Sequence, residues 1–320
     1  MLAHVSTSDT ARDMDVLRGA MGEKKLDYVG FSYGTVLGAT YADLFPTHVG
    51  RMVLDGAVDP ALGNVELQHG QAKGFELALR RFVDNCDQQS DCPLPGGTQA
   101  GLDRIAKFFD ELDSKPLPTN DPKRPLTQAL GQSAVLSLLY FPAYGDWDAL
   151  RQGLAAAFDG DGGPMLEMLD ERNERSSSGK YANNLQYAYY AVNAVDDPDR
   201  PTTAQVATLA EQWSKEAPIF GSVLAWANDM WQYWPVPATD APHATTAKGA
   251  PPILVVGTTY DPATPYPWSQ SLAKELSSGV LLTRVGDGHT GYGKGSACTD
   301  NAVDRFLLTG TAPPAGTVCR

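Results

Sequence analysis

The sequence predicts an α/β protein whose mostly parallel sheet is interrupted by a large helical insertion. Near the amino terminus, two β-rich runs at residues 26–29 and 49–54 enclose one helical pattern, which is the order of a βαβ unit. Near the carboxyl terminus, the runs 252–257 and 280–285 repeat this order. Between the two parts the chain is aromatic-rich and mostly helical. We therefore expect one α/β core split by an insertion.

The predicted domain bounds follow from this change of character after Asp59. Residues 1–59 form the first part of the core, residues 60–249 form a helical cap insertion, and residues 250–320 complete the core. The insertion contains a series of amphipathic patterns that are separated by proline and glycine clusters. These helices are expected at residues 71–86, 101–112, 126–140, 147–158, 165–173, 185–195, 203–216 and 219–231.

The remaining elements of the core are short. A helix over residues 10–21 follows a Ser-Thr-Ser-Asp start signal and ends at Gly22. The run 252–257 is almost continuously apolar, as in a strand that is buried on both faces. Helices are expected at residues 267–276 and 298–309, on either side of the strand 280–285.

Composition limits the possible partners. The chain has 320 residues, 42% of them hydrophobic, and a net charge of -13. Nucleic acids and anionic membranes would repel such a protein, so neither is an expected partner. No apolar run is long enough to span a membrane. The sequence also indicates no metal and no cofactor.

The four cysteines fall into two pairs that are close in sequence, Cys86 with Cys92 and Cys298 with Cys319. Neither pair has metal-ligand spacing, so we expect two disulfides and an oxidising compartment. Free thiols in an intracellular protein are the alternative. Residues 1–5 show no export signal. A secreted protein would therefore need its signal upstream of Met1.

Residues 30–34 read Gly-Phe-Ser-Tyr-Gly, the G-x-S-x-G pattern of a nucleophile elbow. The pattern lies between a predicted strand and a predicted helix, which is the context that its chemistry requires. A sharp turn there would expose the hydroxyl of Ser32, and the first N–H groups of the helix would face a developing oxyanion. Ser32 is therefore the candidate nucleophile.

A serine nucleophile needs a base, and the base needs an orienting carboxylate. Of the five histidines, only His289 lies between glycines in a loop directly after a predicted strand. Asp261 and Asp55 both follow strands and both fit the chain order serine, acid, histidine. We favour Asp261, because Pro262 stiffens its loop and its strand neighbours the histidine strand.

An oxyanion hole needs two N–H donors. The first is expected from Tyr33, the residue after the nucleophile, and the second from a loop that precedes the nucleophile. No such loop is found in the residues ahead of the nucleophile strand.

The chain resembles the secreted tripeptidyl aminopeptidases of actinobacteria, which are α/β-hydrolases with a helical cap related to proline iminopeptidases. The resemblance covers essentially the whole chain, and it rests on the combination of several motifs. These are residues 9–13, 30–35, 38–42, 53–56, 92–94, 257–258, 261–265 and 286–289 with the TAP-like segment 298–319.

The resemblance implies Ser32 as nucleophile, Asp261 as orienting acid and His289 as base. It also implies export and the cleavage of short peptides from a free amino terminus. Family members carry further strands and a glycine-rich oxyanion loop ahead of the region where this chain starts. We therefore expect that Met1 is an internal or misassigned start, or that the chain is a fragment, and that the nucleophile strand lies at or near an open sheet edge.

An aminopeptidase must hold the α-ammonium group of its substrate, which requires a carboxylate in or under the cap. Asp196 and Asp197 are the candidates, with Asp229 as a further one. Alternatively, these residues cap helices or face solvent.

Three classes of function remain open. The first is a serine exopeptidase that acts on short peptides. The second is an esterase or another acyl hydrolase with the same triad, because the triad does not fix the leaving group. The third is an inactive fragment that lacks the second oxyanion donor.

Overall fold

The computed structural model describes all 320 residues, which form two compact units. One unit contains residues 1–74 and 186–320, and the other contains residues 75–185. The bounds 60–249 for the insertion stay a prediction.

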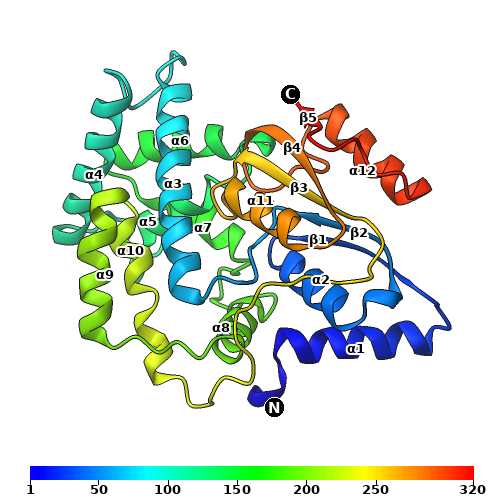
Figure 1. The fold of residues 1–320 in the computed structure, drawn as a ribbon. Helices are drawn as coiled ribbons and strands as arrows, with labels where there is room; N and C mark the ends of the chain where they lie inside the picture. The colour runs from blue at the N-terminus through cyan, green and yellow to red at the C-terminus, as the bar shows by residue number, and fades with distance from the viewer. The chain divides into compact units, whose positions relative to one another are not determined.

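The first unit contains one sheet of five parallel strands in the order β1-β2-β3-β4-β5 (Figure 1). The strands are β1 (Leu26–Phe31), β2 (Val49–Asp55), β3 (Ile253–Tyr260), β4 (Gly279–Asp287) and β5 (Val318–Cys319). The predicted α/β class and parallel sheet are confirmed. Strand β5 was not predicted from the sequence, because its two residues are too few to show a pattern.

Helices cover both faces of this sheet (Figure 1). They are α1 (Thr7–Ala20), α2 (Tyr33–Leu44), α11 (Tyr266–Glu275) and α12 (Ala297–Thr309). Successive residues of a strand point to opposite faces. In β2, Met52 and Leu54 therefore pack in the cluster that contains residues of α1, α2 and α11, whereas Val53 packs with residues of α12.

The register of the strands brings four loops to one edge of the sheet. Phe31 in β1 pairs with Asp55 in β2, and Asp55 pairs with Val256 in β3. Because all strands are parallel, the loops after β1, β2, β3 and β4 leave from the same side. Ser32, Gly56, Asp261 and His289 lie in these four loops.

Strand β1 lies at the edge of the sheet and pairs only with β2. The expected edge position of the nucleophile strand is therefore confirmed. Three large apolar side chains of this part of the chain, Val16, Leu17 and Met21, are more than half exposed, at 71%, 60% and 69%.

The other helices follow the predicted order; α9 has the predicted ends, and the other helices are shifted at one or both ends. They are α3 (Asn64–Cys86), α4 (Thr98–Ser114), α5 (Gln128–Ser137), α6 (Asp146–Phe158), α7 (Gly163–Arg172), α8 (Leu185–Asp196), α9 (Thr203–Glu216) and α10 (Gly221–Trp226). The single helix expected over residues 219–231 was wrong, because α10 is followed by a separate 3₁₀ helix, Asp229–Tyr233. Asn228 separates the two, and its side-chain amide donates to the carbonyls of Leu224 and Ala225.

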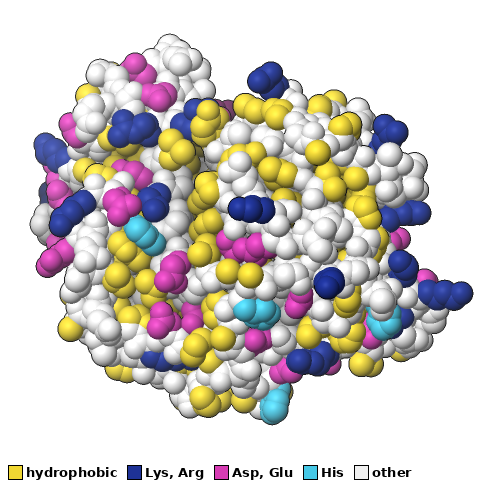
Figure 2. Space-filling model, viewed as in Figure 1, with side chains coloured by type: hydrophobic (Ala, Val, Ile, Leu, Met, Phe, Trp, Pro, Cys, Tyr) yellow, Lys and Arg dark blue, Asp and Glu magenta, His cyan; other side chains and the backbone are white.

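Both expected disulfides, Cys86–Cys92 and Cys298–Cys319, are formed. None of the helices combines the length and the apolar character that crossing a bilayer requires. On the face seen in Figure 2, basic side chains lie among acidic and apolar ones rather than in one large basic area.

Candidate active site

Ser32 occupies a strained turn between β1 and α2. Its backbone has φ 55° and ψ -123°, a positive φ that residues other than glycine rarely adopt. The turn requires Gly30, because a Cβ there would lie 2.3 Å from the carbonyl oxygen of Gly34. The Tyr28 hydroxyl donates to that same oxygen at 2.7 Å. Strain of this kind persists only where the surrounding structure holds it, and it is concentrated at functional sites.

His289 and Asp261 form a buried pair. The histidine Nδ1 lies 2.9 Å and 3.0 Å from the two carboxylate oxygens. The residues are 5% and 3% exposed. An ionised carboxylate only accepts hydrogen bonds, so Nδ1 carries the proton and Nε2 is the basic nitrogen of the ring. This is the tautomer that a general base needs.

The loop after β3 holds the Asp261 carboxylate in place. One oxygen accepts the backbone N–H groups of Ala263 and Thr264 at 3.0 Å and 2.8 Å. The other accepts the Thr264 hydroxyl at 2.9 Å and the Thr290 N–H at 2.9 Å. Sequence reasoning missed Thr264 as a member of the site, although it lies inside the Asp-Pro-Ala-Thr-Pro segment that marked the loop.

The step from Asp55 to Gly56 contacts both the serine turn and the histidine. The carbonyl of Asp55 accepts the Ser32 N–H at 2.9 Å. A Cβ on Gly56 would lie 3.3 Å from Cε1 of His289 and 2.9 Å from Cγ2 of Thr290. Gly56 has φ +64°, so glycine is favoured at this position on both counts. The serine turn and the His289 loop thus approach the same two residues.

Asp55, the alternative orienting acid, serves another purpose. Its side chain is fully buried and accepts the N–H groups of Gly291 and Tyr292 at 2.9 Å and 2.7 Å. Burial raises the pKa of Asp55 to about 6, while these two donors lower it. The carboxylate therefore fixes the backbone just after His289, and Asp261 is the acid that contacts the imidazole.

Tyr33 is the first residue of α2. The first N–H groups of a helix have no partner within the helix, and they favour negative charge. The Tyr33 backbone N–H is therefore suited to donate a hydrogen bond to an oxyanion that forms at a Ser32 adduct. Its phenol oxygen lies 2.6 Å from the hydroxyl of Thr7 in α1.

The three acidic candidates for substrate binding already bond to the protein itself. Asp196 accepts the N–H of Thr7 at 2.8 Å and also its hydroxyl. Asp197 is 4% exposed and accepts the N–H groups of Asn64 and Asp199. Asp229 accepts the side-chain amide of Gln232 at 2.8 Å. A role of Asp196 or Asp197 in binding a substrate ammonium group stays a prediction.

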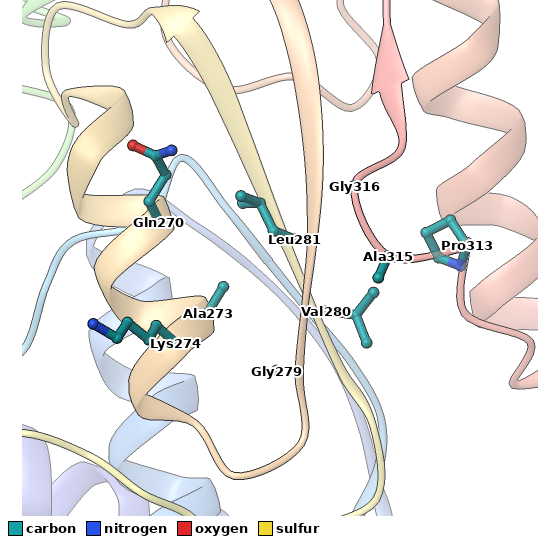
Figure 3. A pocket seen from close by; sticks show the side chains of 9 residues that line it. All are labelled: Gln270, Ala273, Lys274, Gly279, Val280, Leu281, Pro313, Ala315 and Gly316. Carbon is teal, nitrogen blue, oxygen red and sulfur yellow. The ribbon is translucent and has the colours of Figure 1, made fainter.

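Figure 3 shows a cavity of about 330 Å³ in the unit that contains the sheet. It is lined by Lys274 of α11, by Gly279 and Val280 at the start of β4, and by Pro313. His289 follows the opposite end of β4, a strand of nine residues. Such a strand is about 30 Å long, so the cavity is not part of the candidate site.

Sequence comparison relates the chain to hydrolases. Residues 217–319 match the family described as TAP-like protein. Serine protease Hip1 of Mycobacterium tuberculosis is 38% identical over 99% of this chain and 62% of that protein. Carboxylesterase B of the same organism is 38% identical over 99% of this chain and 61% of that protein. Tripeptidyl aminopeptidase of Streptomyces lividans is 30% identical over all of this chain and 59% of that protein. The chain thus spans about three fifths of the length of these relatives.

Proposed function

We propose that this chain is a serine hydrolase that cleaves short peptides from a free amino terminus. Residues 217–319 match the TAP-like family, and nearly the whole chain aligns with a serine protease and with a tripeptidyl aminopeptidase. The observation that carries the proposal is the buried contact between His289 and Asp261, at the sheet edge where the strained Ser32 turn also lies. The substrate class rests on the similarity to a tripeptidyl aminopeptidase.

The chemistry follows from the roles of these groups. The Ser32 oxygen attacks the carbonyl carbon of the substrate while Nε2 of His289 takes the hydroxyl proton. Asp261 holds the ring and stabilises the imidazolium that forms. The Tyr33 N–H donates to the oxyanion. Collapse of this intermediate expels the amine, which receives the proton from His289, and leaves an acyl-serine. Water then attacks the acyl-serine, with the imidazole again acting as base, and releases the acid.

An esterase activity is the second candidate function. Carboxylesterase B is as similar to the chain as serine protease Hip1 is, at 38% identity. The same nucleophile and base can release an alcohol in place of an amine, because the triad does not select the leaving group.

We also propose an oxidising, extracytoplasmic location. The two disulfides support it, because such bonds are rare in proteins that stay in a reducing cytosol.

Three substrates separate these functions: a tripeptide amide with a free amino terminus, the same peptide acetylated, and a nitrophenyl ester. The proposal predicts hydrolysis of the free peptide and little or none of the acetylated one. Hydrolysis of the ester alone would favour the esterase. If no substrate is cleaved and a fluorophosphonate does not label Ser32, the serine hydrolase proposal is wrong.

A further inference from the structure

A series of hydrogen bonds connects the residue after the candidate nucleophile to a partly buried carboxylate. The Tyr33 phenol oxygen lies 2.6 Å from Oγ1 of Thr7, and this oxygen in turn contacts Oδ2 of Asp196. The backbone N–H of Thr7 donates to Oδ1 of Asp196 at 2.8 Å. The three residues come from the starts of α1 and α2 and the end of α8.

The chemistry of the groups decides which atom donates in each bond of this hydrogen-bond series. A threonine hydroxyl has one proton, and an ionised carboxylate can only accept. Thr7 therefore donates to Asp196, and Tyr33 donates to Thr7. Because the last acceptor is charged, the bonds of the chain are stronger than bonds between neutral groups, and each one polarises the next.

The peptide unit between Ser32 and Tyr33 is held on both sides. Its carbonyl oxygen, that of Ser32, accepts the Thr35 N–H at 2.8 Å and the Thr35 hydroxyl at 2.6 Å. Its N–H belongs to Tyr33, whose side chain is fixed by Thr7 and Asp196. A strained turn relaxes unless its surroundings prevent it, so both anchors help to keep this peptide plane in one orientation.

We propose that Thr7 and Asp196 are positioning residues, which aim the Tyr33 backbone N–H at the oxyanion by holding the Tyr33 phenol. This role rests on the proposed serine hydrolase function. It assigns to the start of α1 and the end of α8 a part in the reaction, although neither residue contacts the reacting atoms.

Asp196 makes this positioning dependent on pH. Burial raises its pKa to about 6; the bonds from Thr7 lower it, and the like charges of Asp240 and Asp9 raise it further. Below that pH the carboxyl group is neutral, and the Thr7 hydroxyl loses its charged acceptor. Wild type should then behave like Asp196→Asn.

A matched control lies one residue further along α1. The hydroxyl of Ser8 donates to a carboxylate oxygen of Asp240, as the hydroxyl of Thr7 does to Asp196. The Ser8 hydroxyl does not bond to Tyr33. Ser8→Ala therefore removes the same kind of bond from the same helix turn without touching the elbow.

The test measures the rate constant for labelling of Ser32 by a fluorophosphonate, because the phosphoryl oxygen of this reagent occupies the oxyanion position. At pH 8 we expect Thr7→Val, Asp196→Asn and Tyr33→Phe each to react about tenfold more slowly than wild type, a fraction of the loss on removing an oxyanion donor. Thr7→Ser keeps the hydroxyl and should react at about the wild-type rate. Ser8→Ala should also react at about the wild-type rate. The double variant Thr7→Val with Tyr33→Phe should lose no more of the labelling rate than either single variant, because both substitutions interrupt the same series of hydrogen bonds.

The pH dependence gives a second readout. The ratio of the wild-type rate to the Asp196→Asn rate should approach one as the pH falls below about 6. Thermal unfolding identifies any variant that does not fold. If Thr7→Val or Asp196→Asn does not fold, the test relies on Tyr33→Phe.

Equal labelling of wild type, Thr7→Val and Tyr33→Phe would overturn the positioning role and leave the serine hydrolase proposal in place. Equal losses in Ser8→Ala and Thr7→Val would also overturn it. Absence of labelling in wild type would overturn both proposals.

Discussion

The backbone N–H of Ser32 donates to the carbonyl of Asp55 at 2.9 Å, so the turn after β1 is fixed to the end of β2. The Asp55 side chain in turn accepts two N–H groups of the loop that follows His289. One residue at the end of β2 thus holds the loops of the candidate nucleophile and of the candidate base.

Replacing Gly30 should destabilise the protein strongly. In Gly30→Ala the new Cβ would lie 2.3 Å from the Gly34 carbonyl oxygen, which is backbone and cannot give way cheaply. We expect a loss of about 2 kcal/mol or more in the free energy of unfolding, measured by urea denaturation. Gly19→Ala is the control. Gly19 lies in α1, and a Cβ there would meet nothing within 4 Å. Because alanine favours the helix more than glycine does, this variant should be more stable than wild type by up to about 1 kcal/mol. Similar effects of the two substitutions would contradict this description of the turn.

The strain at Ser32 should appear as a difference in the free energy of unfolding between two variants of this residue. Ser32→Ala keeps a Cβ at φ 55°, whereas Ser32→Gly removes it. We expect the glycine variant to be about 1 kcal/mol more stable than the alanine variant, because glycine adopts positive φ without steric cost. Neither variant should react with a fluorophosphonate at this position. An alanine variant as stable as the glycine variant would show that the turn is not strained.

Asp261→Asn should abolish most of the activity while the protein stays folded. An asparagine side chain can present its amide to Nδ1 and favour the wrong tautomer of His289, and a loss of about 10⁴-fold in kcat is expected for a base in this state. The measurement is kcat on the nitrophenyl ester, with the thermal midpoint as a check on folding. A loss of less than tenfold would remove Asp261 from the proposed triad.

The local parts of this site could be predicted from the sequence, and the long-range parts could not. The Gly-Phe-Ser-Tyr-Gly turn, the Asp261 loop and the His289 loop each carry their signal within a few residues, next to strands with clear patterns. The role of Asp55 and the bond between Thr7 and Asp196 depend on which segments meet in space. Their residues are ordinary turn and cap residues in the sequence, so no local pattern distinguishes them.

The same limit applies to the fold. The four longer strands and their parallel order followed from apolar runs alternating with helices. Strand β5 has two residues and pairs through Thr283 with Val318 and Arg284 with Cys319, which no periodicity can indicate. The break between α10 and the 3₁₀ helix depends on Asn228, whose buried amide bonds to carbonyls of its own turn.

Asp55 should make the stability depend on pH between about 4 and 6. Burial raises its pKa in the folded protein from 3.8 to about 6, so in this range the folded state holds a proton that the unfolded state has lost. The contribution of Asp55 to the free energy of unfolding is therefore greatest below pH 4 and falls as the pH rises through 6. The shift corresponds to a change on the order of 3 kcal/mol.

Urea denaturation of wild type and Asp55→Asn at several pH values isolates this contribution. The difference in unfolding free energy, wild type minus variant, should decrease from pH 4 to pH 6 and stay constant above. A difference that does not vary with pH would mean that Asp55 titrates alike in the folded and unfolded states.

The central claim is that the Ser32 hydroxyl is activated by His289, which Asp261 orients. The most direct measurement is mass spectrometry of the chain after reaction with a fluorophosphonate, for wild type, Ser32→Ala and His289→Ala. We predict one adduct in wild type, located on Ser32, none in Ser32→Ala, and a rate at least a hundredfold lower in His289→Ala, the lower range for loss of a general base, about 10²–10⁴. An unmodified Ser32 in wild type, or equal labelling of wild type and His289→Ala, would contradict the claim.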